Sequence, residues 1–181
     1  MRGGSVDPGH SPSSRAVLRF SAVTASSFAA MEVAAYVLHR YVFHGPLWGV
    51  HRTHHEPDHG HVPFASQTWR FETNDLFSVG FAAASMGMMW VGRESPAEST
   101  AFPLGLGVAV YGGLYFVLHD VYTHGRFASF RTKNPAAQAV KRAHGRHHQS
   151  LSKGGQEPYG LFLFPPSYGR RFKRRRDADA G

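Results

Sequence analysis

Ten of the thirteen histidines in this 181-residue chain fall into one pattern that is written twice. Each copy is a pair of histidines five residues apart, followed by an HxxHH box. The first copy comprises His39, His44, His51, His54 and His55. The second copy comprises His119, His124, His144, His147 and His148. Metal binding is the most demanding role of an imidazole, so the duplicated spacing predicts that these ten side chains are metal ligands.

Helix geometry indicates how each copy can bind. The three positions of an HxxHH box lie within about 100° of arc on an α-helix, so their imidazoles can converge on one point. Histidines five residues apart lie about 140° apart, and they share an ion only where the helix ends or bulges between them. Gly45 and Pro46 after His44, and Gly125 after His124, predict such helix ends.

Ten imidazoles are too many for one ion. An octahedral ion takes six ligands, so two ions with about five histidines each keep an open position for dioxygen or water. The chain has no cysteine, which excludes iron–sulfur clusters or a thiolate-ligated haem held by this chain and disfavours a structural zinc site. Imidazole alone does not choose among iron, copper, nickel and zinc. A histidine-rich metal sponge, or a surface that titrates, is the alternative, but its histidines would be contiguous rather than spaced.

Three apolar segments predict a helical membrane protein. They run from about 16 to 38, 76 to 92 and 101 to 118, and the last two carry no charge. Such lengths match about 30 Å of hydrocarbon, the shortest only marginally. The polar turn at 93–100 predicts that the last two segments form a hairpin. Their small residues favour close helix packing. These are Gly80, Ala82–Ser85, Gly87, Gly105, Gly107, Gly112 and Gly113. A soluble helical core is the alternative.

Charge predicts the orientation. The chain from His119 onward carries thirteen Lys and Arg residues, whereas the hairpin turn carries only Arg93. By the positive-inside rule, both histidine copies lie in the cytoplasm and the N-terminus lies outside. The basic run at 170–176 fits anionic lipid or a solvated tail; without a recognition motif, no nucleic-acid partner is expected.

We therefore expect an all-α fold: an integral-membrane helical bundle with about three transmembrane helices and a cytoplasmic histidine-box metal site. Residues 1–14, rich in Gly, Ser and Pro, are expected to be a disordered lead. Residues 15–166 would form the membrane domain, and residues 167–181 the basic tail.

Five stretches resemble bacterial β-carotene hydroxylases, a branch of the fatty acid hydroxylase superfamily of integral-membrane diiron enzymes. These stretches occur in the same order over about residues 30 to 166. They are EVAAYVLHRYVFHGPLWGVHRTHHEP (32–57), FETNDLF (71–77), YGGLYFVLHD (111–120) followed by His124, AHGRHH (143–148) and YGLFLFPP (159–166). Residues 58–70, with His59 and His61, look like an extra loop, and residues 155–158 also depart from the family pattern.

The resemblance implies a non-haem diiron monooxygenase that uses O2 to hydroxylate carbon 3 of β-ionone rings. β-Carotene would become β-cryptoxanthin and then zeaxanthin. The ten box histidines carry over as ligands of two iron ions, and electrons would come from an external ferredoxin-type donor. Related alternatives are a carotenoid ketolase and a lipid or fatty-acid hydroxylase or desaturase. A zinc hydrolase would need HExxH, which this chain lacks, and a metal carrier would need polar groups within the spans.

Four further residues are candidates for orienting the histidines, because metal-bound imidazoles use polar acceptors on their second nitrogen. Asp120 adjoins His119, and Asn74 and Asp75 precede the second apolar segment. Glu32 lies two turns before His39, where an acidic group within a span is costly. We expect it to face a polar cavity or pair with the histidines; an amphipathic interface position is the alternative.

Overall fold

The computed structural model describes residues 13–55, 71–126 and 132–169, and all regular structure in these ranges is helical. Most of the predicted lead, the loop at 58–70 and the basic run at 170–176 lie outside the described residues. The helices, in chain order, are α1 (Ser14–Val37), η1 (Leu38–Phe43), α2 (Trp48–His55), α3 (Asp75–Val91), α4 (Ala101–Tyr115), η4 (Phe116–Thr123), α5 (Pro135–His147) and α6 (Pro166–Gly169).

Two of these elements, η1 and η4, are π-helical turns that continue α1 and α4 without a break. The helix ends lie where glycine and proline predict them. The first helix ends at Phe43, before Gly45 and Pro46, and the second ends at Thr123, before Gly125. Gly125 has a φ of 66°, a left-handed conformation that glycine adopts without strain.

The helix α4 packs against both α1 and α3, and two glycines permit the close approach. A Cβ on Gly107 would lie 2.5 Å from the carbonyl oxygen of Thr24 on α1. A Cβ on Gly105 would lie 2.6 Å from the carbonyl oxygen of Ser85 on α3. Packing through small residues is thus confirmed at these two positions. Four other predicted glycines face open space: Gly80, Gly87, Gly112 and Gly113.

In the described part of the chain, the long helices expose large apolar side chains, and some of their polar side chains are buried. Large side chains on the long helices are exposed, including Leu18 (71%), Trp90 (66%) and Val91 (76%), while Glu32 and Ser85 are buried. A water-soluble helical core would show the opposite arrangement, so this surface fits a membrane protein. The continuous helices Ser14–Phe43 and Ala101–Thr123 are both long and apolar enough to cross a membrane.

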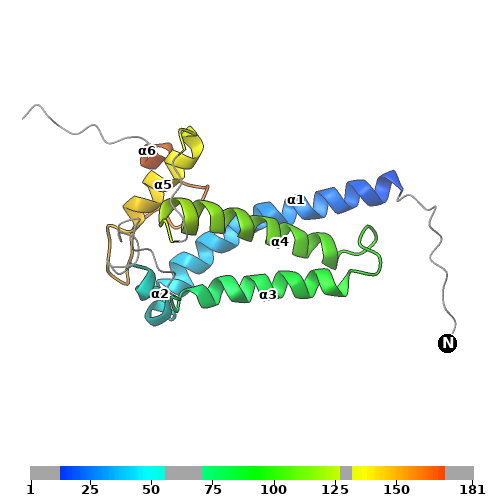
Figure 1. Cartoon of the computed structure of the whole chain (residues 1–181), viewed down its shortest axis with the longest axis horizontal. Coiled ribbons are helices and arrows are strands. Elements are labelled where there is room, and N and C mark those ends of the chain that lie inside the picture. The colour runs from blue at the N-terminus through cyan, green and yellow to red at the C-terminus, as the bar shows by residue number, and fades with distance from the viewer. Residues whose placement is uncertain (1–12, 56–70, 127–131, 170–181) are drawn as a thin grey trace, which may run out of the picture.

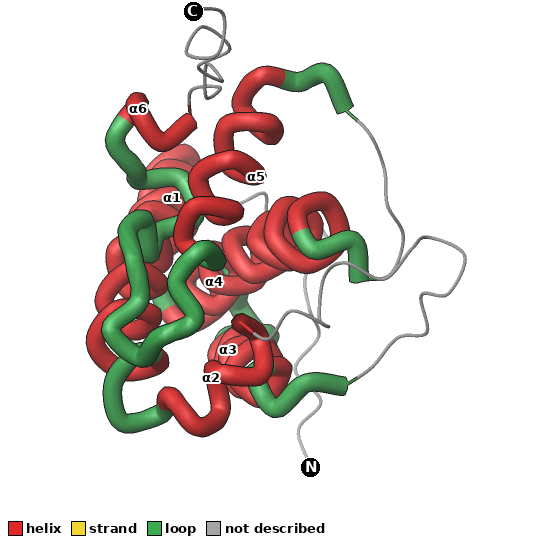
Figure 2. Tube along the Cα trace, turned by 90° about the vertical axis from the view of Figure 1, so that its left-hand side faces the viewer, coloured by secondary structure: helices red, strands yellow, loops and turns green. Residues whose placement is uncertain are grey.

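The third apolar helix, α3, has 17 residues and spans about 25 Å. It forms the expected hairpin with α4, and the turn between them lies at one end of the molecule (Figure 1). The elements that carry histidines gather at the opposite end, where α2 and α5 lie across the ends of the long helices (Figures 1 and 2). The bundle therefore places all ten box histidines far from the hairpin turn.

Candidate metal centre

The ten box histidines form two clusters of five. Within each cluster, one ring nitrogen from every histidine lies within 4.8 Å of those of the other four. Cluster 1 is His39, His44, His51, His55 and His147. Cluster 2 is His54, His119, His124, His144 and His148. The division into five and five is the one expected for two ions that share ten ligands.

The π-helical turns bring the histidines five residues apart onto one face. The backbone N–H of His44 donates to the carbonyl of His39 at 2.9 Å, and His124 donates to His119 at 3.0 Å. This i→i+5 bond defines a π-helix and stacks the two residues one above the other. Each pair therefore shares a cluster because the helix bulges between its members, one of the two conditions that the spacing requires.

The three histidines of each HxxHH box do not converge on one point, contrary to the expectation from helix geometry. In α2, His51 and His55 face cluster 1, whereas His54 faces cluster 2. On an α-helix, position i+4 lies about 40° to one side of position i, and position i+3 lies about 60° to the other side. The side chains of His54 and His55 therefore diverge by about 100° around the helix axis. Because α2 lies between the clusters, this divergence places them in different clusters.

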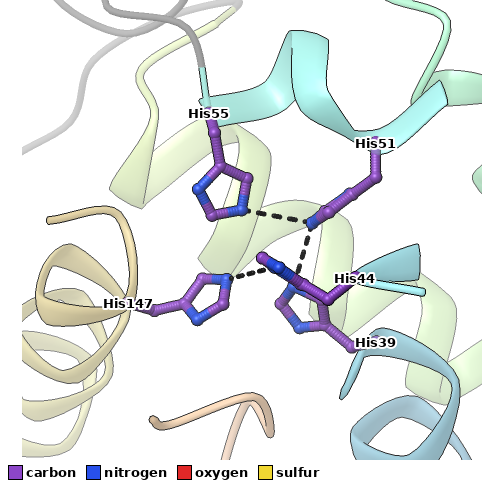
Figure 3. Close-up of side chains that lie close together, drawn as sticks. All are labelled: His39, His44, His51, His55 and His147. Atoms are coloured by element: carbon purple, nitrogen blue, oxygen red, sulfur yellow. Dashed lines mark hydrogen bonds between the residues drawn. The ribbon is translucent and has the colours of Figure 1, made fainter. Parts of the chain in front are cut away.

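The histidines of the second box are divided between the two clusters in the same way. In α5 and its cap, His144 and His148 face cluster 2, and His147 crosses to cluster 1. His147 is fully buried, and it meets His44 of the first copy across cluster 1 (Figure 3). Each cluster thus takes four histidines from one copy and one histidine from the other, which ties the two halves of the chain together.

The proton positions in cluster 1 show why a cation fits there. His44 Nδ1 lies 3.1 Å from the carbonyl oxygen of Lys153, and His147 Nδ1 lies 2.5 Å from that of Gln156. A carbonyl only accepts, so both Nδ1 atoms carry the proton and both Nε2 atoms of the neutral rings carry lone pairs. Yet these Nε2 atoms face each other at 3.2 Å (Figure 3). Two lone pairs repel at that distance unless a cation lies between them.

The remaining imidazoles of cluster 1 follow the same rule. His39 Nδ1 lies 2.8 Å from the carbonyl oxygen of Tyr159, and His55 Nδ1 lies 3.1 Å from that of Ser150. Both Nε2 atoms face His51 Nε2, at 3.0 and 3.2 Å (Figure 3). The five rings therefore present inward-facing nitrogens in the form that binds a metal.

Burial supports the neutral form. Loss of solvation lowers the pKa of His51 to about 3 and the pKa of His55 to about 4, and nearby imidazoles add to the effect. Burial also lowers the pKa values of His144, His147 and His148 well below the usual range. Protons thus do not compete for these nitrogens near neutral pH.

Cluster 2 also consists of five histidines, but the hydrogen-bond partners of their rings differ from those in cluster 1. His54 and His119 bring their Nε2 atoms to 3.1 Å, and His124 and His144 bring theirs to 2.9 Å. The Nε2 atom of His148 is buried without a hydrogen-bond partner in the described part of the chain. A buried imidazole nitrogen without a hydrogen-bond partner, close to four other histidines, is in the environment expected of a metal ligand.

A buried ionic group adjoins cluster 2. The Arg126 guanidinium binds Asp75 through two bonds of 2.7 and 2.8 Å, reaches Asp120 at 2.9 Å and lies 3.4 Å from Glu72. Glu72 and Asp120 in turn contact His54 and His119, each at 3.3 Å. Burial raises the pKa of Glu72 to about 7.

The four predicted orienting residues have different outcomes. Asn74 contacts His51 Nδ1 at 2.7 Å, and Asp120 contacts His119 Nδ1 at 3.3 Å. Asp75 contacts Arg126 and the backbone N–H of Glu72 rather than a histidine. Neither Glu72 nor Arg126 was among the predicted orienting residues, although Glu72 lies in the FETNDLF stretch that carries the resemblance.

Glu32 is buried but its partners are not histidines. Its carboxylate accepts hydrogen bonds from Tyr111 at 2.7 Å and from the backbone N–H groups of Phe162 and Leu163 at 2.9 Å each. These bonds fasten the segment after Tyr159 to α1. Since the carbonyl of Tyr159 orients His39, Glu32 acts on cluster 1 only through the backbone.

A cavity of about 390 Å³ connects the clusters to the apolar bundle. Its walls come from α1 and η1, α2, α3, α4 and η4, and from Tyr159, and many of the lining side chains are aromatic, methionine or alanine. His39 and His51 of cluster 1 and His54 and His119 of cluster 2 all line it. An apolar molecule in the cavity would therefore lie against both clusters.

These features define an all-helical protein with two candidate membrane helices and two histidine clusters that could each hold a metal ion, next to an apolar cavity. The chain belongs to the fatty acid hydroxylase family, whose model matches residues 24–165. It is 33% identical to a β-carotene hydroxylase of Pantoea ananas over 83% of this chain and 86% of that protein. A β-carotene hydroxylase of a Paracoccus strain is 34% identical over 75% of this chain and 78% of its own length.

Plant proteins are similar as well. The chloroplastic β-carotene 3-hydroxylase 2 of Arabidopsis thaliana is 33% identical over 80% of this chain, which spans 45% of the plant protein. No solved structure matches the chain. The family membership that the sequence motifs predict is thus confirmed.

Proposed function

We propose that this protein is an O2-dependent carotenoid hydroxylase that acts on carbon 3 of β-ionone rings, converting β-carotene to β-cryptoxanthin and then zeaxanthin. The substrate class rests on the named activity of the relatives. The observation that supports hydroxylation of an apolar ring is the cavity, because its mostly apolar lining includes histidines from both clusters. A lipid-soluble ring can enter from the bilayer and stop beside the metal positions.

Two iron ions are proposed as the resident metals, one for each cluster of five histidines. When bound, they would supply the activation of O2 that inserts oxygen into an unreactive C–H bond. The chain's own residues hold the ring in place and exclude water. Phe77 and Phe81 of α3 and Tyr115 of α4 line the cavity next to the histidines. The peptide carbonyls and carboxylates on the Nδ1 atoms keep the imidazoles in one tautomer and orientation.

The membrane arrangement is proposed as three spans, with α3 as the third, the N-terminus outside and both clusters in the cytoplasm. The hairpin of α3 and α4 supports this, since its turn and the clusters lie at opposite ends of the bundle (Figure 1). Arg93 lies over the Trp90 ring at 3.8 Å at this turn, a pairing suited to a membrane interface. Electrons are proposed to come from a ferredoxin-type donor at the cytoplasmic surface.

Expression in a bacterial host that accumulates β-carotene tests the activity, with pigments separated by chromatography. The expected products are β-cryptoxanthin and zeaxanthin. A matched strain expressing the His119→Ala variant should retain β-carotene. Ketones such as canthaxanthin would instead indicate a ketolase. Unchanged β-carotene, with iron and a competent donor present, would contradict the carotenoid assignment and favour a lipid substrate.

A further inference from the structure

The two clusters differ in the charge of the groups that hold their imidazoles. In cluster 1, all five Nδ1 atoms contact neutral oxygen acceptors. These acceptors are the backbone carbonyls of Ser150, Lys153, Gln156 and Tyr159 and the side-chain amide of Asn74. No formal charge therefore acts on cluster 1 through these bonds.

In cluster 2, two of the five Nδ1 atoms contact carboxylates. His54 Nδ1 contacts Glu72, and His119 Nδ1 contacts Asp120, both at 3.3 Å. These His54 and Glu72 side chains are each 2% exposed, and the Asp120 side chain is 9% exposed. Water therefore screens these contacts little, so the negative charge that each carboxylate carries acts directly on its imidazole.

Arg126 contacts both of these carboxylates and positions them. Its guanidinium reaches Asp120 and Glu72 and binds Asp75 through two further bonds. Among the described residues, three carboxylates thus lie around one guanidinium beside cluster 2, whereas the acceptors of cluster 1 include no carboxylate. A buried carboxylate is stabilised by a nearby cation.

A carboxylate that accepts from Nδ1–H makes the opposite nitrogen of the ring a stronger electron donor than a carbonyl does. We propose that Glu72 and Asp120, positioned by Arg126, make cluster 2 the tighter of the two metal positions, so that the two irons are inequivalent. This inference rests on the proposed binding of one iron in each cluster. Cluster 1 then loses its iron first, and cluster 2 retains its iron.

Iron release from the purified, iron-loaded protein tests the difference. In excess chelator, the protein should lose iron in two phases, each of about one iron per chain, with rates at least ten-fold apart. His144→Ala removes a ligand of cluster 2 and should leave only the fast phase. Mössbauer spectra of 57Fe-loaded protein should show two iron environments in equal amounts, a signal independent of turnover.

Two further variants separate the charge effect from a loss of folding. The double variant Glu72→Gln, Asp120→Asn keeps the size of both side chains and removes their charges. It should accelerate the slow phase about ten-fold or more and leave the fast phase unchanged. Asn74→Asp is the matched control, because it places a carboxylate on His51 of cluster 1. It should slow the fast phase.

The possible failures are distinguishable. Loss of both irons in a single phase would overturn the inequivalence and leave the hydroxylase assignment standing. Equal acceleration of both phases in the double variant, or a fast phase unaffected by Asn74→Asp, would also overturn it. A chain that binds fewer than two irons would overturn both the inference and the proposed metal content.

Discussion

His54 and His119 bring their Nε2 atoms to 3.1 Å across 65 residues of chain, although the nearest histidines in His54's own box face the other cluster. This contact, with the reciprocal contact of His44 and His147 at 3.2 Å, joins the two halves of the histidine pattern. Neither cluster has five histidines unless both halves of the chain are folded together.

Replacing His54 should therefore affect cluster 2 and not the cluster that its box neighbours form. We expect His54→Ala to reduce the iron content from about two to about one per chain and to abolish turnover. Elemental analysis of the purified protein and the pigment assay measure both effects. His61→Ala, outside the two copies, should keep both irons; an active His54→Ala enzyme would contradict the assignment of the ligands.

Filling the cavity should block the substrate without removing the metal. Ala82 and the adjacent Ala83 of α3 are both exposed, but only Ala82 lines the cavity. We expect Ala82→Trp to lower carotene turnover by about ten-fold or more, because a misplaced ring loses its reactive geometry. Ala83→Trp should retain activity, and both variants should retain two irons. Equal activity of the two variants would show that the substrate binds elsewhere.

Removing the Glu32 carboxylate should destabilise the fold. Glu32→Ala leaves the Tyr111 hydroxyl and two backbone N–H groups without their acceptor. We expect a loss of about 2–3 kcal/mol in the free energy of unfolding, because buried donors without partners are costly. Thermal unfolding in detergent measures this loss, with the exposed Glu98→Ala at the hairpin turn as control. An unchanged Tm for Glu32→Ala would contradict the role of Glu32 as a fastening residue.

The membrane orientation can be tested by labelling single introduced cysteines, since the chain has none. Ser95 is exposed at the hairpin turn, and Ser152 is exposed near the clusters. In intact cells, Ser95→Cys should react with an impermeant reagent, and Ser152→Cys should react only after the membrane is opened. Labelling of both from the same side would contradict the proposed hairpin.

Much of the site could be predicted because its signal is local. The ligand set follows from the type and spacing of the histidines, and helix ends follow from glycine and proline. The bulge between His39 and His44 is one of two outcomes that the spacing allows. The third span and the side of the membrane rest on length and charge alone, and they stay predictions.

The sequence by itself determined which histidines are candidate metal ligands, how many ions their number suits and where the apolar helices run, because these properties depend on side-chain chemistry and helical period. Only the tertiary structure decided which histidine joins which cluster. The i+3 and i+4 positions diverge by about 100° around a helix. Because α2 and α5 lie between the clusters, His54 of the first box joins cluster 2 and His147 of the second box joins cluster 1. The partners of Glu32 and the link from Arg126 to Glu72 were decided in the same way, by contacts between distant segments that no local pattern records.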